Sequence, residues 1–345
     1  MKHTIGDLRQ YQSLPLSAKI IMTQRRIRAW YDYWDGQVYV SFSGGKDSTV
    51  LLHLVRELYP DVEAVFVDTG LEYPEIRQFV KTFDNVTILR PKVSFVDVIK
   101  NFGYPLISKN VSGTVDQARK NIANGKTDTI RVKKIKGTLV RSDGGSSLFN
   151  CKKYEPLLNV DFRLSNMCCD IMKKNPVKAF GKQTGKKPIT AQMADESKQR
   201  EVKWLQNGCN GFEMKSPISN PMSFWTEQDV LQYIKENNLP IASVYGDVVY
   251  KGTDGNLYDN TIGNGNLTTT GCNRTGCIFC GFGCHLEKSP TRFERLRETH
   301  PRQYEYCLGG GEYVDGVWQP NKRGLGMRHV FDELNQIYGD GFIKY

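Results

Sequence analysis

The sequence predicts an α/β fold with a doubly wound, mostly parallel sheet, on three observations. Short β-branched and aromatic runs alternate with amphipathic helical segments in the first half of the chain. A glycine-rich turn at residues 43–48 joins the first such run to the next helical segment. The 345 residues are also long enough to bury a large core. Such alternation produces parallel βαβ units, whose ligands bind at the carboxyl ends of the strands.

The individual elements follow from local hydrophobic spacing and from turn residues. Apolar positions at helical intervals predict helices, and compact β-branched runs predict strands. Thr226, followed by Asp229, is a typical helix N-cap. In chain order we expect a lead-in helix (17–34), a strand (37–42), a helix (49–58), strands at 62–68, 86–89 and 188–193, a capped helix (226–236) and a helix at 330–338.

This order divides the chain into three predicted parts. Residues 1–34 form a helical lead-in, and residues 35–250 form a nucleotide-binding α/β domain. Residues 251–345 form a cysteine-rich and C-terminal region. The α/β pattern breaks near residues 110–160, which we interpret as an insertion. Its basic run at residues 131–136 would ordinarily be a solvated loop, or else a contact with nucleic acid.

Composition excludes several classes of protein. Hydrophobic residues make up 39% and charged residues 24%, which excludes a wholly disordered chain. No apolar run is long enough for a membrane span and no signal peptide is visible, so we expect a cytoplasmic protein without membrane contact. The net charge of +10 suits nucleotides or nucleic acid. Nine cysteines, concentrated in the second half, indicate metal or redox chemistry rather than a disulfide framework.

The turn at residues 43–48 is a candidate phosphate-binding loop. Its glycines let the backbone approach an anion at the start of a helix, and Lys46 adds a positive charge. We expect the loop to face solvent, with Ser43 and Ser48 donating hydrogen bonds to a pyrophosphate. The spacing of its glycines is not that of a Walker A loop. The candidate nucleotide-binding residues here are Ser41, Ser43, Gly44, Gly45, Lys46, Asp47 and Ser48.

A second candidate site is a cysteine loop near the C-terminus. Its thiols, interspersed with glycines, can fold around an inorganic core. An iron-sulfur cluster and a structural zinc knuckle both fit this pattern, and buried thiols without a metal are the third interpretation. The four residues are Cys272, Cys277, Cys280 and Cys284.

The string Ser-Gly-Gly-x-Asp-Ser at residues 43–48 resembles the fingerprint of the PP-loop ATP pyrophosphatase superfamily. The resemblance implies a sheet like that of the adenine nucleotide alpha hydrolases. It also implies cleavage of ATP between its α and β phosphates, adenylation of a substrate and release of pyrophosphate. Lys46 and Asp47 would be the catalytic residues, Lys46 holding phosphate and Asp47 placing Mg²⁺ or the loop itself.

Within this superfamily the sequence resembles the phosphoadenosine phosphosulfate (PAPS) reductase branch. The segment from Asp68, Thr69 and Gly70 to Pro74 and Glu75 carries the resemblance. Supporting segments occur at 103–109, 168–176, 196–200 and 220–230, so the resemblance covers residues of about 35–285. Within that branch the sequence also resembles the iron-sulfur ATPases of DNA phosphorothioation systems. The resemblance adds the residues Asp68, Thr69 and Gly70 to the nucleotide site, and a nucleic acid or a sulfur-donor protein as partner.

The resemblance also implies a 4Fe-4S cluster. In sulfonucleotide reductases a tandem cysteine pair joins a Cys-x-x-Cys motif, which this chain matches with Cys168, Cys169, Cys277 and Cys280. Cys277 and Cys280 serve either the distant-pair or the local-loop arrangement. Cys272 follows, with Cys168 or Cys169 as the fourth ligand. Cys284 is a weaker candidate, and the remaining cysteines, Cys151, Cys209 and Cys307, are expected to be structural.

Two departures from the reductases affect the prediction. Ala191 and Met193 stand where reductases usually carry Gly-x-Arg. Reductases also carry their nucleophilic cysteine in a short tail, whereas no cysteine follows Cys307 in this sequence. Our first hypothesis is therefore an ATP-using PP-loop enzyme with a 4Fe-4S cluster, acting in sulfur transfer or nucleic-acid modification. One alternative is a phosphoadenosine or adenosine phosphosulfate reductase. Another is a nucleic-acid-binding module with a structural zinc knuckle.

Overall fold

The computed structural model describes residues 2–252, 255–258 and 266–345, and the chain forms two compact units. Unit 1 contains Met1–Arg90 and Pro176–Thr275, and unit 2 contains Pro91–Asn175 and Gly276–Tyr345. Each unit is therefore built from two separate stretches of chain.

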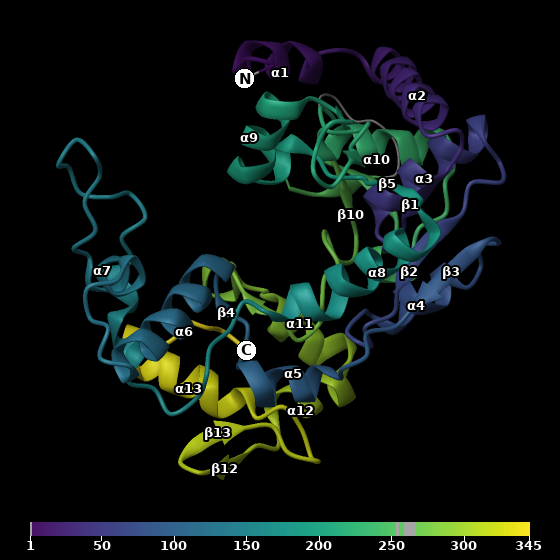
Figure 1. Ribbon diagram of the computed structural model, residues 1–345. Coiled ribbons are helices and arrows are strands. Elements are labelled where there is room, and N and C mark those ends of the chain that lie inside the picture. Colours follow the sequence, from purple (N-terminus) through teal and green to yellow (C-terminus); the bar gives the residue numbers. More distant parts are fainter. Residues whose placement is uncertain (1, 253–254, 259–265) are drawn as a thin grey trace. The chain divides into compact units, whose positions relative to one another are not determined.

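Unit 1 carries a six-stranded, mostly parallel sheet (Figure 1). The strands in spatial order are β3 (Val86–Leu89), β2 (Ala64–Val67), β1 (Val38–Ser41), β5 (Lys187–Ile189), β7 (Ile218–Ser219) and β6 (Asn210–Gly211). Only the β6–β7 pair of this sheet is antiparallel. In the central strand, Val40 pairs with Ala64 on one side and Ile189 on the other. This arrangement confirms the predicted α/β class.

Helices and a small second sheet complete unit 1. Helices α2, α3 and α10 pack on one another, and Ile27, Trp30 and Leu51 are buried in this core. The helices are α1 (Ile5–Gln12), α2 (Leu16–Tyr33), α3 (Lys46–Leu58), α4 (Pro74–Val80), α8 (Asn175–Thr184), α9 (Lys198–Asn207) and α10 (Glu227–Glu236), with short 3-10 turns at Ala194–Glu196 and Ser243–Tyr245. The second sheet is antiparallel, with β8 (Val248–Lys251) between β9 (Leu257–Tyr258) and β10 (Asn266–Thr269).

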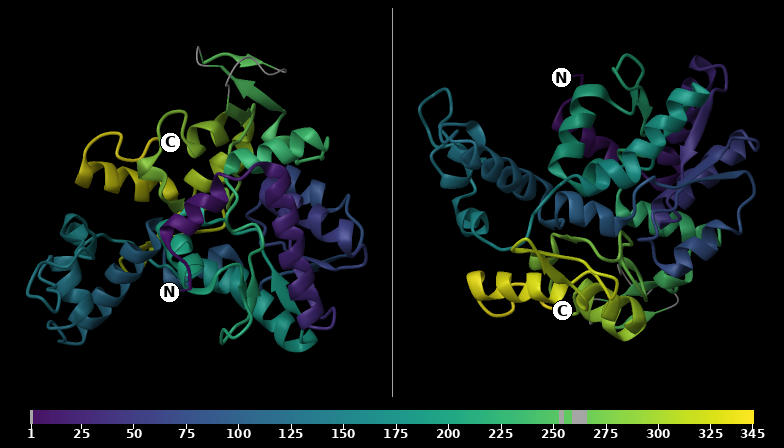
Figure 2. Two further views of the ribbon diagram at one scale, coloured as in Figure 1. Left: turned by 90° about the horizontal axis from the view of Figure 1, so that it is seen from above. Right: turned by 60° about the horizontal axis from the view of Figure 1, so that its bottom comes forward.

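Unit 2 is mainly helical. A short parallel pair joins its two chain stretches, with Leu106 of β4 opposite Gly281 of β11. Helices α6 and α7 lie side by side in both views of Figure 2. The elements are α5 (Phe95–Phe102), β4 (Leu106–Ile107), α6 (Lys109–Ala123), α7 (Ile130–Lys136), η1 (Lys152–Leu158), η2 (Asp170–Lys174), β11 (Gly281–Phe282), η5 (Cys284–Leu286), α11 (Arg292–Thr299), α12 (Pro301–Leu308), the hairpin β12 (Glu312–Val314) and β13 (Val317–Gln319), and α13 (Met327–Tyr338).

Most predicted elements are confirmed, with two corrections. The strand expected at 188–193 ends at Ile189. The basic run at 131–136 is a helix and not a loop. Thr129 caps its first turn by accepting a hydrogen bond from Val132 N, and Val132 and Ile135 are buried on one face. Amphipathic spacing thus outweighs the high local charge.

Within the described ranges, no helix is both long enough and apolar enough to cross a bilayer.

Candidate functional site

The predicted phosphate loop joins β1 to the N-terminus of α3. Gly45 is the N-cap residue and Lys46 begins the helix, so the first amides of α3 point into the loop. Gly44 has a φ of +70°, and a Cβ there would lie 2.8 Å from side-chain carbons of both Ile76 and Val80. Only glycine meets both the backbone conformation and the close packing at this position.

The two serine hydroxyls hold the loop together. Ser43 Oγ and Ser48 Oγ lie 3.0 Å apart, and Ser48 Oγ also donates to Gly45 O at 2.9 Å. Ser43 N donates to Ser48 Oγ at 3.1 Å. In this structure the hydroxyls close the turn and fix its shape, and their donation to a pyrophosphate stays a prediction.

Lys46 is buried, with only 2% of its surface exposed, so the expectation that the loop faces solvent is wrong at this residue, although Ser43 is exposed. Its Nζ lies 2.8 Å from Glu227 Oε1 and donates to Asn273 O at 2.6 Å. Its main-chain N contacts Tyr245 OH at 3.4 Å. Distant segments of unit 1 therefore cover the lysine and hold its ammonium group in place.

Asp47 is half-buried, and its carboxyl lies among cations. Burial raises its pKa above the ordinary 3.8, while the charges of Lys46, Arg274 and Arg200 lower it and that of Glu227 raises it. Its Oδ1 is buried and accepts no hydrogen bond from any residue that the structure describes. An oxygen in this state has unused capacity to accept a hydrogen bond or to bind a Mg²⁺ ion.

Arg200 and Arg274 supply guanidinium groups to this part of unit 1. Both bind Glu196: Arg200 forms an ion pair with it from the first turn of α9, and Arg274 Nη2 lies 3.5 Å from Glu196 Oε1. Met193, which stands where an arginine was expected, is buried. Sequence reasoning placed Arg200 in a matching segment but missed Arg274, which lies between Cys272 and Cys277 and carries no motif signal of its own.

The predicted residues after β2 form a self-contained turn. Thr69 donates from both N and Oγ1 to Glu72, and Gly70 N donates to Asp68 Oδ1 at 3.2 Å. Arg77 Nη2 donates to Asp68 Oδ2 at 3.0 Å. Since β1 and β2 are parallel neighbours, this turn and the phosphate loop lie at the same edge of the sheet.

Four of the five predicted cluster ligands belong to unit 2 and influence one another. Burial raises the pKa of Cys168, and the thiols of Cys277, Cys169 and Cys280 raise it further. Burial also raises the pKa of Cys280, where Cys169 acts in the same direction. The folded chain thus brings the tandem pair near the Cys-x-x-Cys motif. A group of four thiols is a donor set that suits a 4Fe-4S cluster.

The fifth predicted ligand, Cys272, belongs to unit 1. Cys284 is buried close to Cys280, and its Sγ lies 3.1 Å from Gly281 O. Cys307 and Cys209 are buried, as expected of structural residues. No disulfide links any of the nine cysteines, all of which fall in the described ranges.

Comparison with known proteins identifies several relatives. The profile of the phosphoadenosine phosphosulfate reductase domain matches residues 37–104 and 109–281. The chain is 23% identical over 220 residues to the adenosine 5'-phosphosulfate reductase of Staphylococcus epidermidis, covering 62% of this chain and 68% of that protein. It is 34% identical over 74 residues to the phosphoadenosine 5'-phosphosulfate reductase of Photorhabdus laumondii, covering 21% of this chain and 30% of that protein.

Shorter matches and one structure complete the comparison. Two uncharacterized proteins of Methanocaldococcus jannaschii, MJ0973 and MJ0066, are 34% and 37% identical over 87 and 84 residues. Each match covers 23% of this chain, and the chain spans only 21% and 18% of their lengths. A crystal structure of the Candida auris PAPS reductase, in complex with phosphate, has a TM-score of 0.37 at 17% identity, covering 70% of this chain and 90% of that one.

The profile match settles the family. It covers more than half of the chain and includes the phosphate loop, the turn after β2 and the four cysteines Cys168, Cys169, Cys277 and Cys280. The chain therefore belongs to the phosphoadenosine phosphosulfate reductase domain family, a family of enzymes.

Proposed function

We propose that this chain uses ATP to adenylate a substrate and releases pyrophosphate. The observation that carries the proposal is the intact loop at the N-terminus of α3, with Lys46 as its first helical residue and Asp47 beside it. Backbone amides at a helix start attract phosphate, and Arg200 and Arg274 act on the same carboxyl as Lys46. Three cations around one loop suit a ligand with several phosphate charges.

Each residue has a definite task in this proposal. The Gly44–Gly45 backbone and the first amides of α3 hold the departing pyrophosphate. Lys46 exchanges its contact with Glu227 for a phosphate oxygen, which concentrates positive charge where negative charge develops. Asp47 offers its unpartnered Oδ1 to the Mg²⁺ that accompanies ATP.

A sulfonucleotide reductase is the second candidate. The match to the Staphylococcus epidermidis protein, whose name is adenosine 5'-phosphosulfate reductase, favours it. Arg200 and Arg274 could also bind a sulfate, in place of the arginine that Met193 replaces. Both candidates use an adenine nucleotide in the same loop, so they differ in which nucleotide reacts.

We also propose that Cys168, Cys169, Cys277 and Cys280 hold a 4Fe-4S cluster within unit 2. Positive side chains accompany these thiols: Lys173 lowers the pKa of Cys168, and Arg292 and Lys109 lower that of Cys280, against the larger effect of burial. Nearby cations stabilise thiolates, the form that binds metal. When bound, such a cluster supplies one-electron chemistry. Cys272, in unit 1, is not needed for a set of four.

A nucleic-acid-binding module is the third candidate, favoured by the basic helix α7. Two of its lysines are already engaged, because Lys133 Nζ lies 2.7 Å from Asp128 Oδ1 and Lys134 Nζ donates to Asn110 Oδ1 at 2.5 Å. We therefore place nucleic acid, like a sulfur-donor protein, among the acceptors or partners of the enzyme. The cytoplasmic location expected from the sequence stays a prediction.

The product identifies the function. Protein purified without oxygen is incubated with Mg-ATP and candidate acceptors, and pyrophosphate and AMP are measured. In parallel, adenosine phosphosulfate or PAPS is supplied with thioredoxin, and sulfite is measured. Pyrophosphate without sulfite supports the proposal, whereas sulfite without ATP turnover supports the reductase. Brown protein absorbing near 400 nm supports the cluster, and colourless protein with stoichiometric zinc supports the binding module.

A further inference from the structure

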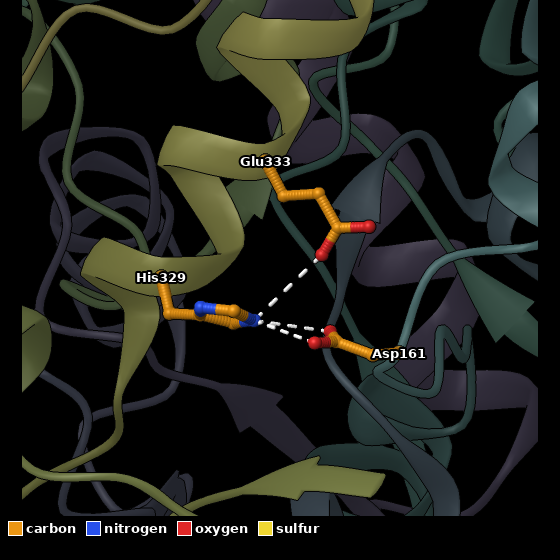
Figure 3. Close-up of side chains that lie close together, drawn as sticks. All are labelled: Asp161, His329 and Glu333. Carbon is orange, nitrogen blue, oxygen red and sulfur yellow. Dashed lines mark hydrogen bonds and ion pairs between the residues drawn. The ribbon is translucent and has the colours of Figure 1, made fainter. Parts of the chain in front are cut away.

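Three side chains of unit 2, far apart in sequence, converge outside the sites described above. They are Asp161, His329 and Glu333, and one nitrogen or oxygen from each lies within 4.8 Å of the other two. Figure 3 shows His329 and Glu333 projecting from α13 toward Asp161, which lies on a facing segment. We call these three residues the Asp–His–Glu cluster.

The distances place all three groups around one point. His329 Nε2 lies 3.0 Å from each carboxylate oxygen of Asp161 and 3.7 Å from Glu333 Oε2. His329 and Glu333 are four residues apart, so one turn of α13 presents both on the same face. All three are partly exposed, which leaves the cluster accessible from solvent.

Outer contacts hold the cluster in shape. Trp318 N donates to the main-chain oxygen of Asp161 at 2.8 Å, and its ring lies 4.4 Å from the His329 ring. Tyr313 OH donates to Asp161 Oδ2 at 2.6 Å. Both residues come from the β12–β13 hairpin, so this hairpin orients one carboxylate and one imidazole together. Metal ligands in proteins are typically oriented by such secondary hydrogen bonds.

Arg119 fixes the chain segment that carries Asp161. Its guanidinium donates to the main-chain oxygens of Leu157, Leu158, Val160 and Phe162 at 2.6 to 3.0 Å. The arginine is thus committed to the backbone and forms no hydrogen bond with the cluster in the structure as described. Two carboxyl groups and one imidazole remain to face a ligand.

We propose that Asp161, His329 and Glu333 bind a divalent first-row transition-metal cation through one imidazole nitrogen and two carboxylate oxygens. This donor set suits Mn²⁺, Fe²⁺ or Zn²⁺. Three protein ligands leave coordination positions for water or for a substrate oxygen. The alternative is a hydrogen-bonded cluster that stabilises unit 2 without metal.

Manganese is the probe of choice, because the cysteine thiols prefer softer metals. The full chain, without a histidine tag or nucleotide, is titrated with Mn²⁺, and free Mn²⁺ is followed by electron paramagnetic resonance. Asp161→Asn and His329→Gln each remove one ligand, and we expect them to weaken binding at least ~100-fold. Tyr313→Phe keeps every ligand but removes an orienting hydrogen bond, and we expect a weakening of about 10-fold.

A matched control lies on α3. His53 and Glu57 are also four residues apart, with Nδ1 3.8 Å from Oε1, but they belong to no three-ligand group that the structure describes. His53→Gln should leave Mn²⁺ affinity unchanged. Metal should also raise the unfolding temperature of the wild type but not of Asp161→Asn. The proposal is overturned if the wild type binds no Mn²⁺ at millimolar concentration, or if Asp161→Asn and His329→Gln bind it as well as His53→Gln.

Discussion

The phosphate loop of unit 1 and the cysteine group of unit 2 are built in opposite ways. The loop is one continuous stretch, whose shape comes from its own glycines and serines. The cysteine group draws its tandem pair from one chain stretch and its Cys-x-x-Cys motif from another. A continuous site can be recognised locally, whereas an assembled site depends on the fold that brings its parts together. Substitutions should therefore affect the two sites differently.

The largest effect is expected in the assembled site. Cys277→Ser or Cys280→Ser should remove most of the iron and destabilise unit 2, because the proposed cluster would link two chain stretches. Iron content and thermal unfolding are the measurements. Cys151→Ser is the control. This half-buried cysteine of unit 2 lies outside the proposed set of ligands, so the variant protein should keep its iron. Equal iron loss in all three variants would contradict the proposed ligands.

In the continuous site, Lys46→Ala should lower the rate of pyrophosphate release by about 10²–10³-fold, because one preorganised charge is lost. Iron content should not change. Lys19 provides a matched control, since it is equally buried in unit 1 but pairs with Asp229 at 2.7 Å. Lys19→Met should lower stability and leave turnover per folded molecule intact. Similar turnover in Lys46→Ala and the wild type would remove the phosphate-loop assignment.

The shape of the loop can be tested through stability. Gly44→Ala combines a strained positive φ with a clash against Ile76 and Val80, and it should cost about 2–4 kcal/mol of unfolding free energy. Gly185→Ala, with a φ of +75° and nothing within 4 Å, should cost only the strain, about 1–2 kcal/mol. Denaturant titration compares the two. Equal losses would show that close packing does not require glycine at the loop.

We expect the ionised Asp47 side chain to lower the stability of the fold while contributing to turnover. Its folded-state pKa is raised by burial, so the unfolded chain releases this proton more readily and ionisation reduces stability as pH rises. Asp47→Asn should therefore be more stable than the wild type at neutral pH, yet slower in turnover. The gain should shrink as pH falls through the raised pKa. A less stable Asp47→Asn protein at pH 7 would contradict the burial argument.

The sequence predicted the parts whose signals are local. The central strands, α2, α3 and the Thr226-capped α10 appear close to their expected bounds. The high local charge of residues 131–136 wrongly predicted a loop. This segment is helix α7, because Val132 and Ile135 are buried on one face.

The surroundings of the sites could not be predicted. Lys46 is covered by Glu227 and Asn273, and Asp161 meets His329 across a separation of 168 residues. Neither contact follows a short spacing pattern, because each depends on how distant segments pack. The division into two discontinuous units has the same origin.

The central claim is that the loop at the start of α3 serves ATP, and competitive turnover tests it most directly. The anaerobically purified chain is given Mg-ATP, the candidate acceptors and PAPS, with thioredoxin as reductant. Binding of each nucleotide, pyrophosphate and sulfite are measured in the wild type and in Lys46→Ala. We predict tighter binding of Mg-ATP, pyrophosphate without sulfite, and loss of pyrophosphate release in Lys46→Ala. Tighter binding of PAPS with sulfite formation would contradict the account and establish the reductase.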